Sequence, residues 1–93
     1  MIIGLDYDDT YTADPVFWDK VIDLAIERGH DVHCVTGRDE PPDESEPQLP
    51  PGVEVICAGE MFKRHACEAV GIRIDVWIDD CPGLIEPQRK LDW

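Results

Sequence analysis

Basic residues are scarce in this sequence of 93 residues, where 8 lysines and arginines stand against 21 aspartates and glutamates. The formal net charge is −13, and so negative a surface repels phosphate backbones, which disfavours nucleic acid as a partner. Long apolar runs are also lacking, so we expect no membrane-spanning helix and no membrane partner. The first residues carry no basic leader, which favours a cytoplasmic protein.

Paired cysteine motifs are absent as well. None of the four cysteines belongs to a CxxC pair, and no secretion signal precedes them, so we expect free thiols rather than a disulfide scaffold. One alternative is a zinc site, whose ligands would be His33, Cys34, His65 and Cys67. The spacings of these residues match no zinc template.

What the sequence does contain is a series of short apolar runs, which predict strands at 1–5, 32–35, 53–57 and 75–78. Two helical segments alternate with them, and the whole length fits one domain, 1–93, with a modest core. The predicted fold class is α/β: a three-layer, Rossmann-like sandwich with a mostly parallel sheet of four or five strands. After Cys81 we expect either a short helix near Leu84 or a fifth, closing edge strand.

The first helix is expected to start at Asp14 and Pro15, an N-cap followed by a first-turn proline, and to stop at Gly29. Its residues at helical spacing are Phe17, Val21, Leu24 and Ala25. The second helix is expected over 61–70, and its apolar face would be Phe62, Ala66, Ala69 and Val70. Between the second and third strands, residues 39–52 are acidic and proline-rich, which predicts a surface loop.

Polar clusters follow three of the four predicted strands, at 6–10, 36–38 and 79–80. Parallel strands place their carboxyl ends along one edge of a sheet, where ligands of open α/β sheets bind. Asp6 and Asp8 would meet Asp79 and Asp80 there, and such crowding of carboxylates is costly without a cation. Carboxylate oxygens suit Mg²⁺, which would also hold a substrate phosphate, so we predict a magnesium cofactor.

The same cluster suggests phosphoryl chemistry. Asp6 is a candidate nucleophile that attacks phosphorus, and Asp8 a candidate general acid and base. Thr36 and the Gly37 backbone N–H could bind a phosphate oxygen, and Lys63 could add a fixed positive charge. Arg38 either binds a distal group of the substrate or offsets the acidic loop.

These motifs resemble those of the haloacid dehalogenase (HAD) superfamily, in order and over nearly the whole chain. Segment 2–10 resembles the family's strand followed by DxDx[T/V], and 32–36 its strand that ends in Thr or Ser. Lys63 stands where the family places a helix-opening lysine, and 76–80 resembles its strand that ends in an acidic pair.

The resemblance implies a phosphatase-like member, because the dehalogenases and phosphonatases of the family lack an aspartate at the place of Asp8. It also implies that Asp6, the Asp8 carbonyl, Asp79 and Asp80 hold Mg²⁺. Neither the segment between the first two motifs nor 39–52 has room for the family's cap domain. The site should therefore be open, which suits a bulky phosphorylated substrate or a partner chain.

Three other functions remain open. One is a nucleotide or nucleic-acid-end phosphatase, and another is a catalytically weak, metal-binding module with a regulatory or scaffolding role. The third is a receiver-type phospho-acceptor domain, although such domains carry the acceptor aspartate after the third strand and 53–57 ends without one. A homo-oligomer is also left open, with Trp93 as a candidate contact.

Overall fold

The computed structural model describes residues 1–87, and the Arg89–Lys90 pair and Trp93 lie outside them. Its strands and α-helices follow one another as β1 (Ile2–Leu5), α1 (Pro15–Glu27), β2 (Asp31–Thr36), β3 (Glu54–Cys57), α2 (Lys63–Ala69) and β4 (Val76–Ile78). Two short 3-10 helices complete the order, η1 (Tyr11–Ala13) and η2 (Pro82–Leu84). The short helix expected near Leu84 therefore forms, and the described residues after Cys81, up to 87, contain no strand.

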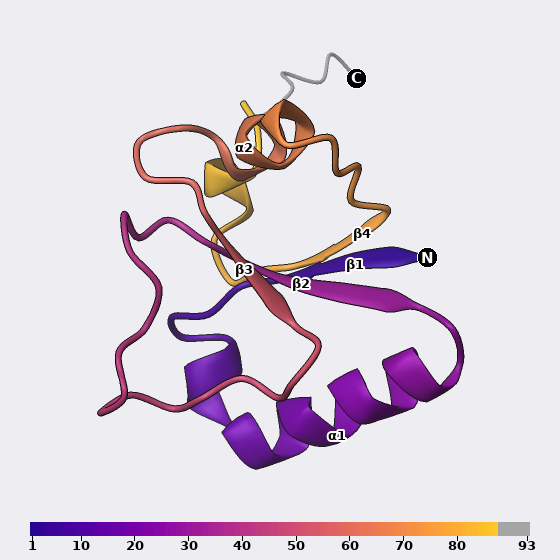
Figure 1. Cartoon of the computed structure of the whole chain (residues 1–93). Coiled ribbons are helices and arrows are strands. Elements are labelled where there is room, and N and C mark those ends of the chain that lie inside the picture. Colours follow the sequence, from indigo (N-terminus) through magenta and orange to yellow (C-terminus); the bar gives the residue numbers. More distant parts are fainter. Residues whose placement is uncertain (88–93) are drawn as a thin grey trace, which may run out of the picture.

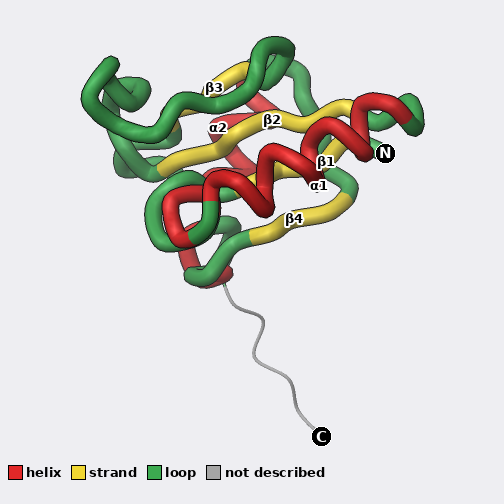
Figure 2. Tube along the Cα trace, turned by 90° about the horizontal axis from the view of Figure 1, so that it is seen from below, coloured by secondary structure: helices red, strands yellow, loops and turns green. Residues whose placement is uncertain are grey.

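The four strands form one sheet in the order β3-β2-β1-β4, and every neighbouring pair is parallel. Helix α1 lies on one face of this sheet and α2 on the other (Figure 1). From below, α1 runs in front of β1 and β2 (Figure 2). The predicted α/β class is confirmed, with four strands within residues 1–87.

Three strands end side by side at the edge that carries the polar clusters. Strand β1 is central, with β2 on one side and β4 on the other, and Leu5 is in register with Cys34 and Ile78. The ladder continues one step further, because the N–H of Asp6 donates to the Ile78 carbonyl at 2.9 Å. The ends of β1, β2 and β4 therefore converge as the sequence predicted.

Helix α1 begins as expected. The Asp14 side chain accepts a hydrogen bond from the Phe17 N–H at 3.2 Å, Pro15 occupies the first turn, and Gly29 follows the helix with φ +86°. The expected apolar face is wrong for Phe17, which is 52% exposed, and for Leu24. Helix α1 carries apolar residues on more than one side, and a different set of them packs against the sheet.

The stripe that faces the sheet consists of Trp18, Ile22 and Ala25. Ile22 is fully buried, and the other two pack against the same cluster. These residues are spaced by four and three, so they also follow helical periodicity. Spacing alone could not distinguish the two stripes.

Helix α2 is shorter than predicted and turns a different face inward. It covers Lys63–Ala69, and its buried residues are Lys63, Ala66 and Cys67. Phe62 precedes the first turn and is 42% exposed, while Val70 follows the last and is 63% exposed. Of the expected apolar face, Ala66 alone is buried.

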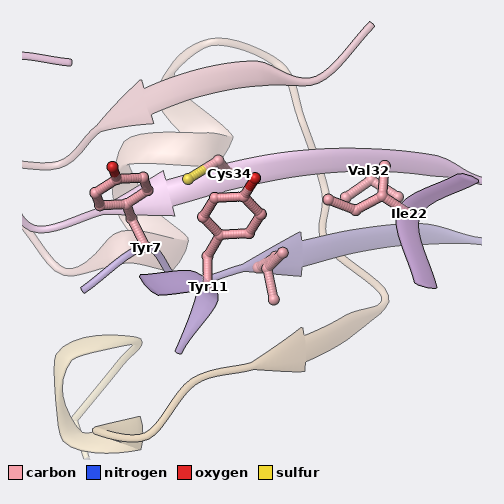
Figure 3. Close-up of a cluster of buried hydrophobic side chains, with 6 residues drawn as sticks. Tyr7, Tyr11, Ile22, Val32 and Cys34 are labelled. Carbon is pink, nitrogen blue, oxygen red and sulfur yellow. The ribbon is translucent and has the colours of Figure 1, made fainter. Parts of the chain in front are cut away.

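The core has two parts, one on each face of the sheet. Tyr7, Tyr11, Ile22, Val32 and Cys34 belong to the part beneath α1 (Figure 3). On the α2 face the buried residues are Val35, Cys67 and Ile74. Strand β2 serves both, because successive side chains of a strand point to opposite faces.

The acidic segment 39–52 contains no helix or strand, as predicted, but two buried tyrosines hold it to the core. The hydroxyl of Tyr7 donates to the Pro47 carbonyl at 2.6 Å. The hydroxyl of Tyr11 lies 2.8 Å from the Gln48 carbonyl and 2.6 Å from Oδ1 of Asp19 on α1, and it shares its one proton between these two acceptors. Both tyrosines are 0% exposed. The loop is therefore fixed against the segment that follows β1.

Neither helix within residues 1–87 combines the length and apolar character that a membrane crossing requires. All four cysteines are free thiols, in agreement with the prediction.

Candidate active site

Asp6 stands at the end of β1 with its carboxylate facing inward. The residue is 7% exposed, and its N–H is bound by the neighbouring strand β4. Oδ1 lies 2.6 Å from Nζ of Lys63, and Oδ2 accepts a hydrogen bond from the Thr10 hydroxyl at 3.0 Å. The strand end and two side-chain contacts thus fix both carboxylate oxygens.

A tight turn brings Thr10 back to Asp6. Asp9 adopts a left-handed conformation with φ +63°, which aspartate tolerates better than most residues, and its N–H donates to Thr12 Oγ1 at 3.0 Å. The N–H of Tyr11 then donates to the Asp6 carbonyl at 3.2 Å. Because the chain turns at Asp9, the Thr10 hydroxyl reaches both Asp6 and Asp80, the latter at 3.2 Å.

Lys63 is buried although lysine is usually solvated. Its residue exposure is 1%, and Nζ contacts Asp6 Oδ1 and Asp79 Oδ2 at 2.6 and 2.7 Å. Burial lowers the pKa of Lys63, but the two carboxylates raise it by more, so the pKa lies above its usual value. The ammonium group is therefore charged and bridges β1 to the segment after β4.

Of the acidic pair after β4, Asp79 has a buried side chain and Asp80 is exposed. Asp79 binds Lys63 through Oδ2 and accepts the Cys81 N–H through Oδ1 at 2.9 Å. Asp80 is exposed and accepts from Thr10. One carboxylate oxygen each from Asp6, Asp79 and Asp80 lies within 4.8 Å of the others, an all-oxygen set of the kind that Mg²⁺ prefers. These residues therefore fit a hard divalent cation.

The crowding of carboxylates changes their protonation. The pKa of Asp6 is raised to about 6, chiefly by burial and also by Asp80, against the opposing effects of Lys63 and Thr10. The pKa of Asp80 is held below its usual value, chiefly by its interaction with the Asp6 carboxyl. A divalent cation would favour the ionised form of both.

Asp8 points to another partner. Arg38 binds it through two parallel hydrogen bonds, Nε to Oδ2 at 2.9 Å and Nη2 to Oδ1 at 2.8 Å. Arg38 lowers the pKa of Asp8, so its carboxylate is ionised in this arrangement. Among residues 1–87, the three-carboxylate cluster does not include the Asp8 side chain.

Thr36 and Gly37 lie at the end of β2. Thr36 is 1% exposed, and its Oγ1 accepts the N–H of Arg38 at 3.2 Å, which fixes the turn after the strand. Gly37 lines a cleft of about 280 Å³, whereas Thr36 is not among the residues that line it. The charged residues that line this cleft are Asp6, Asp8, Asp9, Arg38, Lys63, Asp79 and Asp80.

Sequence reasoning assigned no role to two residues of this site. Thr10 occupies the fifth position of the DxDxT motif, which is the signal that could have indicated it. Glu46 binds Nη1 of Arg38, with its nearer oxygen at 2.7 Å. No local signal distinguishes it from the other acidic residues of the loop, because the contact depends on how the whole segment is anchored.

The alternative zinc site does not form. Within residues 1–87 the one cluster of potential metal ligands is the aspartate group, and it contains no cysteine or histidine. Comparison with protein-family models, with curated proteins and with solved structures gives no match for this chain.

Proposed function

We propose that the chain is a magnesium-dependent phosphomonoester hydrolase of the HAD type that acts through an aspartyl-phosphate on Asp6. One observation supports this most: Asp6 ends the central strand in contact with Lys63 and within 4.8 Å of oxygens of Asp79 and Asp80. The order of the sequence motifs supports the same family. A carboxylate held beside a fixed cation and a cation-binding pair suits phosphoryl transfer.

In the first proposed step, Asp6 attacks phosphorus. A bond forms between its oxygen and phosphorus while the bond from phosphorus to the leaving oxygen breaks. Asp8, ionised while Arg38 binds it, first leaves Arg38 and takes up a proton from solvent, and it then donates this proton to the leaving oxygen. In the second step water attacks the aspartyl-phosphate, Asp8 takes the proton, and inorganic phosphate and Asp6 are released. Asp8 therefore has to leave Arg38 during the cycle.

The remaining residues stabilise charge. Lys63 holds Asp6 in place and offers positive charge at the cleft, and in this proposal the Thr36 hydroxyl and the Gly37 N–H bind phosphoryl oxygens. Mg²⁺ held by Asp6, the Asp8 carbonyl, Asp79 and Asp80 would neutralise negative charge on the transferred phosphoryl group. The described chain has no cap domain over the cleft, so a large leaving group could extend into solvent.

The experiment is phosphate release from 4-nitrophenyl phosphate with and without Mg²⁺. We expect activity that chelation of Mg²⁺ abolishes and that Asp6→Asn lowers by a factor on the order of 10³ or more. Asp23→Asn, an exposed change of the same type on α1, is the matched control and should retain activity. Mg²⁺ binding without turnover in the wild type would instead indicate a non-catalytic metal-binding module.

A further inference from the structure

Arg38 presents an anion-binding fork at the mouth of the cleft. The guanidinium binds both oxygens of Asp8 in parallel, the geometry that arginine uses to recognise carboxylates. Arg38 lines the same cleft as Asp6 and Lys63. One small molecule could therefore contact the nucleophile and this fork together.

The fork is held in place from two sides. Its carbon Cζ lies 5.1 Å from the centre of the Tyr7 ring, and that ring is fully buried with its hydroxyl fixed on Pro47. Glu46 holds Nη1. The edge formed by Nε and Nη2, now occupied by Asp8, is therefore oriented before any ligand arrives.

The occupant of that edge can be exchanged. The side chains of Asp8 and Arg38 are 50% and 32% exposed, and ion pairs this accessible to water are weak. The exchange would replace one carboxylate with another, so the charge at the fork would not change. A singly charged carboxylate suits this cleft better than a second phosphate, because five aspartates already line it.

We propose that Arg38 selects phosphomonoesters whose leaving group carries a carboxylate, which replaces Asp8 in the fork and releases Asp8 toward the leaving oxygen. This inference rests on the phosphatase function proposed above. It assigns the substrate class as phosphorylated hydroxy acids or carboxyphenols. A carboxylate on the substrate should raise kcat as well as lower KM, because its binding frees the general acid.

The experiment compares 3-carboxyphenyl phosphate with 3-carbamoylphenyl phosphate, a neutral substrate of nearly the same shape. We expect the wild type to prefer the carboxylate by roughly tenfold in kcat/KM, the effect of one charge-assisted bidentate contact. Arg38→Ala should bring the ratio close to one. Arg38→Lys, which keeps the charge but loses the fork, should retain only part of the preference. Arg73→Ala removes the same charge at an exposed position before β4 and should leave the ratio unchanged.

A second readout needs no turnover. The corresponding benzylphosphonates, one with a carboxylate and one with a carboxamide, should differ in Kd in the same direction for the wild type but not for Arg38→Ala. Equal kcat/KM for the two phosphates, or a preference that survives Arg38→Ala, overturns the role of Arg38 and leaves the phosphatase intact. If neither phosphate is hydrolysed, the phosphatase proposal fails, and the substrate-selection proposal fails with it. The phosphonate pair then decides whether Arg38 still recognises a carboxylate.

Discussion

Nζ of Lys63 and Oδ1 of Asp6 lie 2.6 Å apart, although 57 positions separate the two residues in the sequence. Their side chains are only 2% and 8% exposed. Water therefore screens neither charge well: Asp6 depends on Lys63 for compensation, and Lys63 depends on Asp6 and Asp79. This contact joins the first turn of α2 to the end of β1.

Replacement of Lys63 by methionine should destabilise the fold more than the loss of an ordinary lysine. Asp6 and Asp79 would lose their shared cation, and the removal of one partner from a buried ion pair costs about 3–5 kcal/mol. Urea unfolding at neutral pH measures the difference, with Lys20→Met on the exposed side of α1 as the control. A loss of less than about 1 kcal/mol, in the range of surface pairs, would contradict the buried role of Lys63.

Metal binding should depend on pH through Asp6. Its pKa is raised to about 6, so the metal-free site binds a proton below that pH, and a cation has to displace it. The apparent affinity for Mg²⁺ should fall by up to tenfold for each pH unit below about 6 and level off above it. Calorimetric titrations from pH 5 to pH 8 measure this dependence. Asp6→Asn should bind more weakly and lack the change of slope near 6, whereas an affinity independent of pH in the wild type would argue against Asp6 as a ligand.

The strands were predictable to within one or two residues, because strands of a parallel sheet are short, nearly continuous apolar runs. The inward face of α1 was not, since Phe17 and Leu24 satisfy helical spacing as well as Trp18 and Ile22 do. That choice depends on how the helix crosses the sheet. It therefore belongs to tertiary packing rather than to local sequence.

The candidate site, like the fold, was predictable from the sequence only in part. The grouping of Asp6 with Asp79 and Asp80 followed from the rule that parallel strands bring their carboxyl ends to one edge. The engagement of Asp8 by Arg38 did not, because it depends on the turn at Asp9 and on the position of the acidic loop. Contacts set by a single turn or by a loop anchored at a distance leave no periodic signal in the sequence.

The two tyrosine hydroxyls should determine how firmly the loop 39–52 is held. Tyr7→Phe and Tyr11→Phe keep the buried rings and remove the hydrogen bonds to Pro47 and Gln48, each worth about 1 kcal/mol, and Tyr11→Phe also removes the contact to Asp19 on α1. The double variant should therefore be cleaved faster in this loop by a glutamate-specific protease, which finds Glu44 there. Cleavage at the wild-type rate would mean that other contacts hold the loop.

Replacement of Gly4 by a larger residue should destabilise the fold, because neighbouring side chains leave too little space for it. A Cβ atom at this position of β1 would lie 3.0 Å from both Ile74 Cγ2 and Trp77 Cε3, closer than ordinary van der Waals contact. The backbone of Gly4 is not left-handed, so alanine meets no conformational penalty there. Gly4→Ala should therefore destabilise by about 1–3 kcal/mol through overpacking, measured by urea unfolding monitored by tryptophan fluorescence.

A matched change separates crowding from other effects of alanine at Gly4. Gly83→Ala adds the same methyl group where nothing lies within 4 Å, and it should alter stability little. Ile74→Ala removes the Cγ2 atom that Gly4→Ala would crowd, so the double variant should lose less stability than the two single losses together. Strict additivity would show that Ile74 is not what limits the space at Gly4, and would leave the Trp77 ring as the obstacle.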